Sequence, residues 1–173
     1  MFSLYDIKKE YERLDKITGL NISRDVEVSV TSRCTRRRGV YKRRSENGVL
    51  QYEKIVISNF VLSEPPESFF DTIRHEYAHA MDRKLNGPYN TSHSESWKRC
   101  CKIVGCVPSA TTETSDAQME YRKSKGYTLR CQTCGHEWNY QRMSKTLKAI
   151  MGGIKYECPY CNRKNLSVTA NQK

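Results

Sequence analysis

The pentapeptide His75-Glu76-Tyr77-Ala78-His79 brings two imidazoles and one carboxylate together within five residues. On a helix, which turns by about 100° per residue, His75 and His79 lie about 40° apart on one side. Two histidines at this spacing bind one zinc ion, and the glutamate beside the first serves as the general base of a hydrolase. Because the chain contains four histidines in all, two at this spacing favour a metal site over incidental surface histidines.

A catalytic zinc ion usually has three protein ligands and one open coordination position, so His75 and His79 need a third donor. His93 is the remaining histidine of this segment and follows His79 by 14 residues. Glu95 is the alternative, because some hydrolases with this motif complete the site with a glutamate. We favour His93 as the third ligand. Asp82 falls on the histidine face, where it would either orient a ligand imidazole or remain a solvated acid.

Four of the eight cysteines form two Cys-x-x-Cys pairs, Cys131 with Cys134 and Cys158 with Cys161. Two such pairs supply the four thiolates of a closed, tetrahedral, structural zinc site. A redox role is the alternative, but two matched pairs favour metal binding. His136 is either an alternate ligand or a polar residue without a metal role, and we favour the second interpretation. The sequence therefore predicts two Zn²⁺ ions, one catalytic and one structural.

The histidine motif lies in a segment whose pattern predicts a helix from about residue 66 to residue 85. Pro65-Pro66-Glu67 has the proline and acid of a first helical turn, and Asn86-Gly87-Pro88 ends the pattern. The apolar side chains of this helix lie opposite the histidines, and they are Phe69, Phe70, Ile73, Tyr77, Ala80 and Met81. The helix is therefore expected to bury its apolar side and to turn both imidazoles toward a cleft.

Hydrophobic periodicity predicts the surrounding elements. The predicted helices cover residues 3–18 and 95–104, and the predicted strands cover residues 26–30, 49–58, 127–130, 137–140 and 154–157. Together they indicate an α+β protein in which helices pack on a short antiparallel sheet, followed by a four-cysteine zinc ribbon. The expected organisation is a catalytic domain at 1–108, a linker at 109–126 and a ribbon at 127–173.

The net charge of +11 is distributed unevenly along the chain. Residues 65–115 hold six basic and six acidic side chains, whereas residues 116–173 hold 11 basic and four acidic ones. A further basic segment contains seven cationic residues and no acid, namely Arg33, Arg36, Arg37, Arg38, Lys42, Arg43 and Arg44. Such an excess either makes the surface soluble or binds a polyanion, and for this segment we favour a polyanion.

The first ten residues carry charges from Asp6 onward and lack the apolar run of a signal peptide. No segment approaches the length of a membrane span. With no signal peptide, the cysteine pairs are better explained by metal than by disulfides. We therefore expect an intracellular, cytoplasmic protein that is not associated with a membrane, and we expect it to be a monomer.

These motifs together resemble the SprT-like metallopeptidases, which include Spartan-type proteases that digest proteins crosslinked to DNA. The resemblance rests on the histidine motif, on Ser92-His93-Ser94-Glu95-Ser96-Trp97-Lys98 and on the four-cysteine ribbon. It implies a small zincin-like core in which His75, His79 and His93 bind zinc and Glu76 is the catalytic acid and base. The family commonly has glycines beside its third histidine, whereas this chain has Ser92 and Ser94.

The leading functional hypothesis is a zinc endopeptidase that acts on DNA-bound or DNA-crosslinked protein substrates. In this hypothesis, DNA is the partner that the seven cations of the basic segment and the ribbon would hold. Two alternatives remain open at the level of sequence. One is a nucleic-acid-binding protein whose histidine motif is structural or vestigial. The other is a peptidase with no nucleic-acid role.

Overall fold

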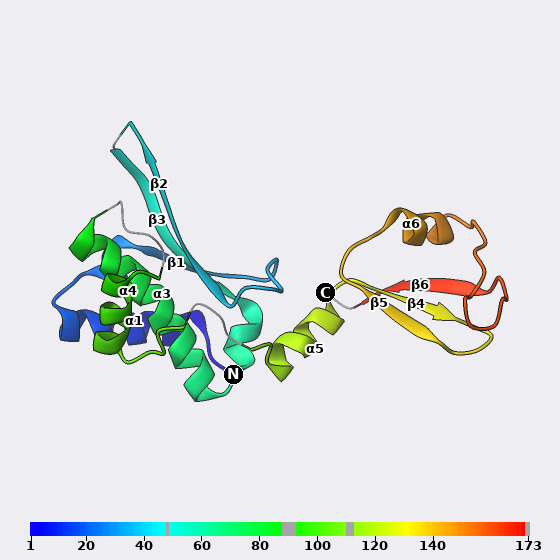
Figure 1. Cartoon of the computed structure of the whole chain (residues 1–173), viewed down its shortest axis with the longest axis horizontal. Helices are drawn as coiled ribbons and strands as arrows, with labels where there is room; N and C mark the ends of the chain where they lie inside the picture. The colour runs from blue at the N-terminus through cyan, green and yellow to red at the C-terminus, as the bar shows by residue number, and fades with distance from the viewer. Residues whose placement is uncertain (48, 88–92, 110–112, 172–173) are drawn as a thin grey trace. The chain divides into compact units, whose positions relative to one another are not determined.

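The computed structural model describes residues 1–47, 49–87, 93–109 and 113–171, and the chain divides into two compact units, Met1–Gln118 and Met119–Lys173. The first unit contains α1 (Leu4–Thr18), α2 (Ile22–Asp25), β1 (Glu27–Thr31), β2 (Gly39–Glu46), β3 (Val49–Ser58), the 3-10 helix η1 (Asn59–Ser63), α3 (Pro66–Asn86) and α4 (Glu95–Val104). The elements of the second unit are β4 (Tyr127–Cys131), β5 (Glu137–Tyr140), α6 (Lys145–Met151) and β6 (Leu166–Ala170), while α5 (Asp116–Ser124) crosses the division (Figure 1). The predicted α+β fold class is confirmed.

The sheet of the first unit has the strand order β1-β3-β2, so the last strand in sequence lies in the middle. β3 occupies the centre because it carries the buried residues Ile55 and Ile57, whereas the basic strand β2 stays at an edge. β2 pairs with β3 in antiparallel fashion, but β1 pairs with β3 in parallel. The expectation of a purely antiparallel sheet was therefore wrong, because β3 is inserted between two strands that precede it.

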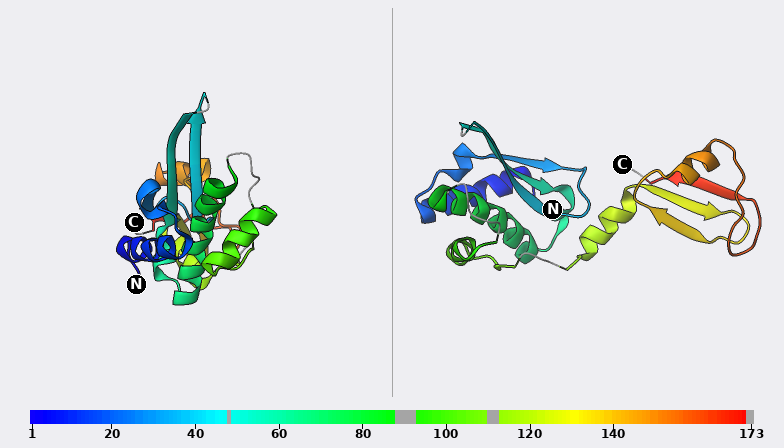
Figure 2. Two further views of the ribbon diagram at one scale, coloured as in Figure 1. Left: turned by 90° about the vertical axis from the view of Figure 1, so that its left-hand side faces the viewer. Right: turned by 45° about the horizontal axis from the view of Figure 1, so that its top comes forward.

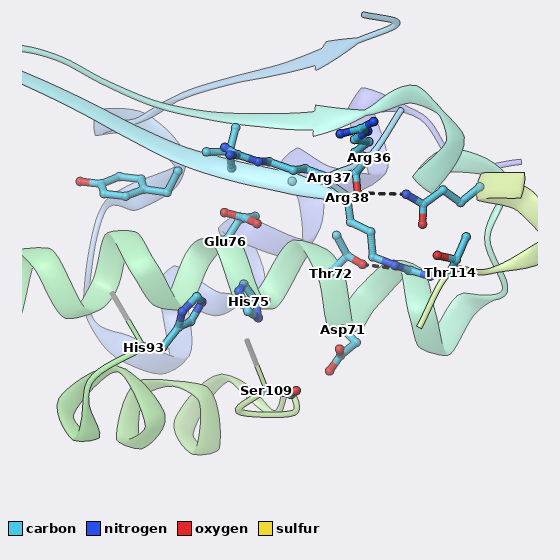
Figure 3. Close-up of a pocket in the computed structure, with 14 residues that line it drawn as sticks. Arg36, Arg37, Arg38, Asp71, Thr72, His75, Glu76, His93, Ser109 and Thr114 are labelled. Atoms are coloured by element: carbon cyan, nitrogen blue, oxygen red, sulfur yellow. Dashed lines mark hydrogen bonds between the residues drawn. The ribbon is translucent and has the colours of Figure 1, made fainter. Parts of the chain in front are cut away.

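One face of this sheet is covered by helices, with α3 packed between the strands and α4 (Figures 2 and 3). The core contains large side chains from each layer, including Tyr11 and Leu14 of α1, Ile57 of β3, Phe69 of α3 and Trp97 of α4. Burial of side chains of this size contributes about 1.5–3 kcal/mol each. Among the described residues, no helix is long and apolar enough to span a bilayer.

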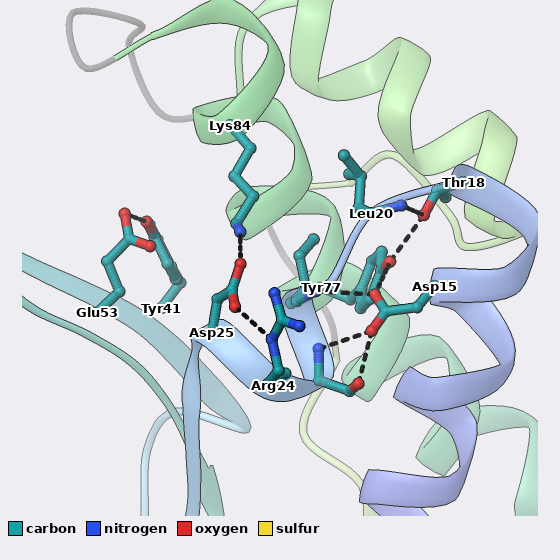
Figure 4. A network of polar contacts seen from close by, with 11 residues as sticks. Asp15, Thr18, Leu20, Arg24, Asp25, Tyr41, Glu53, Tyr77 and Lys84 are labelled. Atoms are coloured by element: carbon teal, nitrogen blue, oxygen red, sulfur yellow. Dashed lines mark hydrogen bonds and ion pairs between the residues drawn. The ribbon is translucent and has the colours of Figure 1, made fainter.

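A polar network fixes α3 against α1 and α2 (Figure 4). Asp15 of α1 accepts a hydrogen bond of 2.7 Å from the hydroxyl of Tyr77 and bonds of 2.9 Å from the amides of Ile22 and Ser23. These partners satisfy a carboxylate that would otherwise be costly beside the core. The network sets the rotation of α3, which carries the histidine motif.

The sequence-predicted helices and strands of the first unit lie within a residue or two of the observed ones. The described part of the predicted linker at 109–126, residues 113–126, has regular structure that its composition did not indicate. It contains α5, and the buried side chain of Gln118 donates hydrogen bonds of 3.0 Å to the carbonyls of Thr35 and Arg36. The hydroxyl of Ser115 donates to Glu64. The first part of the linker therefore packs on the first unit.

The second unit is an antiparallel sheet of order β5-β4-β6 with α6 as its helix. The strands predicted at 127–130 and 137–140 are present as β4 and β5. The strand predicted at 154–157 is absent, because Ile154 and Tyr156 have no face to bury and stay exposed. The third strand is instead β6, which pairs with the free edge of β4.

Candidate metal centre

The histidine motif lies in the middle of α3, whose opposite side is buried in the core. Phe69, Ile73 and Tyr77 are fully buried, as the helical pattern predicts. Proline at the first helical turn and Glu67 beside it favour the N-terminus of the helix. A rigid helix with one buried side fixes the direction in which His75 and His79 point.

The structure brings three imidazoles together. The Nε2 atoms of His75 and His79 lie 3.3 Å apart. One ligand atom from each of His75, His79 and His93 lies within 4.8 Å of the other two. These three residues form a group that could hold one metal ion, and Glu95 is not part of it.

His93 reaches the group through a left-handed backbone conformation, with φ of +62°. Histidine adopts this region more readily than most residues other than glycine. The next residue, Ser94, is extended and caps α4, where its hydroxyl accepts from the amide of Trp97. The backbone turn therefore falls on the histidine itself and not on Ser94, whereas Ser92 lies outside the described residues. Glu95 instead starts α4, exposed to solvent and paired with Lys98 at 2.6 Å.

Trp97 packs against all three imidazoles. Its ring is stacked on His79 at 5.1 Å between centroids, and it meets His75 and His93 edge-on at 4.9 Å and 4.5 Å. Trp97 is 1% exposed. The indole therefore provides a rigid wall that limits the rotation of the three imidazoles.

The histidine rings are in the protonation state that metal binding requires. Burial, together with the neighbouring imidazoles, lowers the pKa of His75 to about 4 and that of His79 to about 3. Burial also lowers the pKa of His93. All three rings are therefore neutral at pH 7, with lone pairs available for a cation.

The side chain of Glu76 extends from α3 toward the edge strand β2, and the residue is 6% exposed (Figure 3). Burial raises the pKa of this carboxyl to about 7, and a hydrogen bond from the backbone of Tyr41 opposes the rise. A Cβ atom at Gly39 would lie 2.7 Å from both Cγ and Oε1 of Glu76. Gly39 therefore leaves the space that the carboxylate occupies, and no local sequence signal connects these two residues.

A cleft of about 480 Å³ opens beside these groups. Figure 3 shows it between α3 and β2, with His75, Glu76 and His93 in its lining. The segment Arg36–Tyr41 forms its wall on the side of the sheet. The cleft is open to solvent, so an extended chain has access to the histidines and the carboxylate.

Asp82 is buried on α3 and its Oδ1 accepts a hydrogen bond of 2.9 Å from Asn86. The interpretation as a solvated acid is therefore wrong.

The four predicted ribbon cysteines meet in the second unit. Their sulfur atoms lie within 4.8 Å of one another, so Cys131, Cys134, Cys158 and Cys161 could hold a second metal ion. The residues after each pair, Gly135 and Asn162, have φ of +76° and +56°. These turns allow backbone amides to point at sulfur, and a hydrogen bond from the amide of Cys134 lowers the pKa of Cys131 to about 6. The low pKa of Cys131 favours its thiolate, which is the ligand form, whereas hydrogen bonds among the clustered thiols raise the pKa of Cys134 and Cys161.

His136 is not a member of the cysteine group. Its ring stacks on Tyr160 at 3.7 Å and lies 4.5 Å from the ring of Trp138.

The structure divides the seven predicted DNA-binding residues into two classes. Arg38 forms an ion pair of 3.1 Å with the buried Glu64, and Arg43 forms one of 3.3 Å with Glu53. Arg44 lies 3.8 Å from Glu46. Arg44 is nevertheless exposed, and so are the remaining four side chains, Arg33, Arg36, Arg37 and Lys42. Arg38 and Arg43 thus hold the fold together and are poorly available to a polyanion.

Comparison with protein families decides the identity of the first unit. A model of the SprT-like family matches residues 7–118, which include the three imidazoles and Glu76. The chain belongs to the SprT-like family. A search of curated proteins found no match. The matched region coincides with the first unit, so the ribbon lies outside the SprT-like match.

Proposed function

We propose that this SprT-like protein is a cytoplasmic zinc endopeptidase that cleaves DNA-bound or DNA-crosslinked proteins. In this proposal, the catalytic domain is 1–108, the ribbon is 127–173, and each carries one zinc ion. The observation that supports it most is the meeting of three neutral imidazoles and a buried carboxylate beside an open cleft.

The donor chemistry fits zinc. Three imidazole nitrogens are a ligand set of catalytic zinc sites and leave one coordination position open. The four thiolates of the ribbon instead fill a tetrahedral site, which suits a structural ion. When bound by His75, His79 and His93, zinc would supply a Lewis acid that polarises a carbonyl and lowers the pKa of water.

The remaining chemistry belongs to Glu76. As a carboxylate it would accept a proton from the attacking water and return it to the leaving amine. The hydrogen bond from the backbone of Tyr41 and the space at Gly39 would hold the carboxylate in place. Burial raises the pKa of Glu76 to about 7, but a nearby dication favours the charged carboxylate, so bound zinc would lower this pKa.

The association with DNA is supported by charge. The net charge is +11, and five cations of the basic segment are exposed. Nucleic acids attract such surfaces through counterion release.

The test is hydrolysis of a DNA-binding protein by the zinc-loaded chain, in the presence and absence of DNA. Cleavage should require zinc, disappear with a chelator, return when zinc is restored, and be faster when the substrate is on DNA. Cleavage that survives removal of zinc would contradict the peptidase mechanism. An equal rate of cleavage with and without DNA would contradict the role of DNA and leave a peptidase without a nucleic-acid role.

Gly39 provides a sharper prediction about the carboxylate. In Gly39→Ala, the new methyl group would collide with the side chain of Glu76 and displace it. A misplacement of about 1 Å at a reacting group costs about 10²-fold in rate, so hydrolysis should fall by about that factor. Zinc content and thermal stability should change little, because a flexible side chain moves and not the backbone.

Ser45→Ala is the matched control, since Ser45 is an exposed residue of the same strand. Steady-state hydrolysis and zinc content would be measured for both variants. Wild-type activity in Gly39→Ala would show that the strand does not position Glu76.

A further inference from the structure

The face of the sheet that points away from the helices carries a second, strongly basic groove. Along β3, Ile55 and Ile57 are buried, so Lys54 and Val56 point to the opposite face. On β2, Lys42 lies directly opposite Lys54 in the sheet register. These residues line a groove of about 640 Å³.

Five cationic side chains line this groove, which we call the outer groove, and no acidic residue lines it. They are Arg33, Arg36, Arg37, Lys42 and Lys54. Within the described residues, none of the five forms an ion pair, in contrast to Arg38 and Arg43. Lys54 was not among the residues predicted from the sequence, because it is separated from the basic segment by the hairpin.

The loop that supplies the three arginines is held in place. Gln118 donates to the carbonyls of Thr35 and Arg36, and Ser58 donates to the carbonyl of Arg37. A held loop loses little conformational entropy when it binds a ligand. The hydroxyl residues Ser29 and Thr31 also line the groove.

We propose that the outer groove binds the phosphodiester backbone of a nucleic acid strand. Arginine, lysine and hydroxyl groups are the usual partners of phosphate oxygens. The cations and hydroxyl groups that line the groove contact phosphate oxygens and do not read base edges. Binding there is therefore independent of sequence and driven by charge.

The position of the outer groove bears on the proposed peptidase. Arg36, Arg37, Gly39 and Val40 line both the outer groove and the cleft beside Glu76. Strand β2 therefore separates the two. Nucleic acid held in the outer groove leaves the cleft clear for a protein attached to that strand. This link rests on the proposed function, whereas the binding of nucleic acid does not.

The first experiment measures binding of a labelled single-stranded DNA oligonucleotide to the full chain as a function of salt. All proteins carry Glu76→Gln, so that no result depends on proteolysis. The double variant Lys42→Gln/Lys54→Gln is compared with Lys8→Gln/Lys16→Gln, which removes two exposed lysines of α1.

Each phosphate contact on a single strand contributes about 0.7 to the slope of log K against log salt. Loss of two contacts should reduce the slope by about 1.4 and weaken binding about 25-fold at 0.1 M salt. The α1 variant should keep the original slope. Equal slopes for the two variants would overturn the proposal. So would displacement of the oligonucleotide by polyglutamate of matched charge at matched concentration.

Cys34 provides a second readout at the groove itself. It lines the outer groove and is half-buried. Its alkylation by the neutral reagent iodoacetamide, followed by peptide mass spectrometry, should slow in proportion to DNA occupancy. Unchanged alkylation of Cys34 at saturating DNA would place the DNA elsewhere on the chain and overturn the proposal.

Discussion

Replacement of Glu76 by glutamine is expected to reduce peptide hydrolysis by about 10²–10⁴-fold, the usual contribution of a general base. Glutamine has nearly the same shape and still accepts the hydrogen bond from the backbone of Tyr41, but it takes no proton from water. The expected zinc ligands are the three clustered imidazoles and do not include Glu76, so the zinc content should stay unchanged. Hydrolysis and zinc stoichiometry would be measured on the same preparations.

Glu67→Gln is the matched control, since Glu67 is an exposed carboxylate on the same helix. It removes the same charge from α3 and should leave hydrolysis unaltered. If the Glu76 and Glu67 variants both cleave at the rate of the parent protein, Glu76 is not the general base and the proposed mechanism fails. If the zinc-loaded parent itself shows no hydrolysis, what remains is a basic binding protein.

Replacement of Cys131 by serine is expected to remove one zinc ion and to unfold the second unit while the first stays folded. Apart from ligand cysteines, the buried apolar side chains described in the second unit are Leu129 and Leu147. Two such side chains cannot offset the conformational entropy of about 50 residues. Metal binding must therefore supply most of the folding free energy of this unit.

Cys34→Ser is the control, because Cys34 belongs to neither group of metal-binding residues. Elemental analysis should give two zinc ions per chain for the parent and this control, and one for Cys131→Ser. Amide hydrogen exchange should become fast in β4, β5 and β6 and stay slow in α3. Protected ribbon strands in a Cys131→Ser protein that has lost its zinc would refute the assignment of a structural metal.

The local chemistry of both metal groups follows from sequence spacing. The i, i+4 spacing of His75 and His79 places two imidazoles on one side of any helix, and each Cys-x-x-Cys pair delivers two thiolates from one turn. Helix boundaries followed from equally local features, such as the prolines before Glu67. These predictions needed only contacts between residues close in the chain.

Contacts between distant residues were decided by the tertiary structure. Sequence spacing left His93 and Glu95 as alternatives, and the structure brings only His93 to the group, because Glu95 begins α4 and turns to solvent. The close approach of Gly39 to Glu76 arises because β2 and α3 pack together. A glycine carries no side chain whose type would indicate such a role.

Residue types and their spacing were enough to show which donor groups this chain possesses and that two sets of them suit zinc. The sequence treated the seven cations of the basic segment alike, and it could not distinguish Arg38 or Arg43 from Lys42. Only the tertiary structure placed Glu64 and Glu53 beside the first two and left Lys42 and Lys54 on one face. Residue type fixes the charge of a side chain, but the groups that neutralise it are brought by folding from distant parts of the chain.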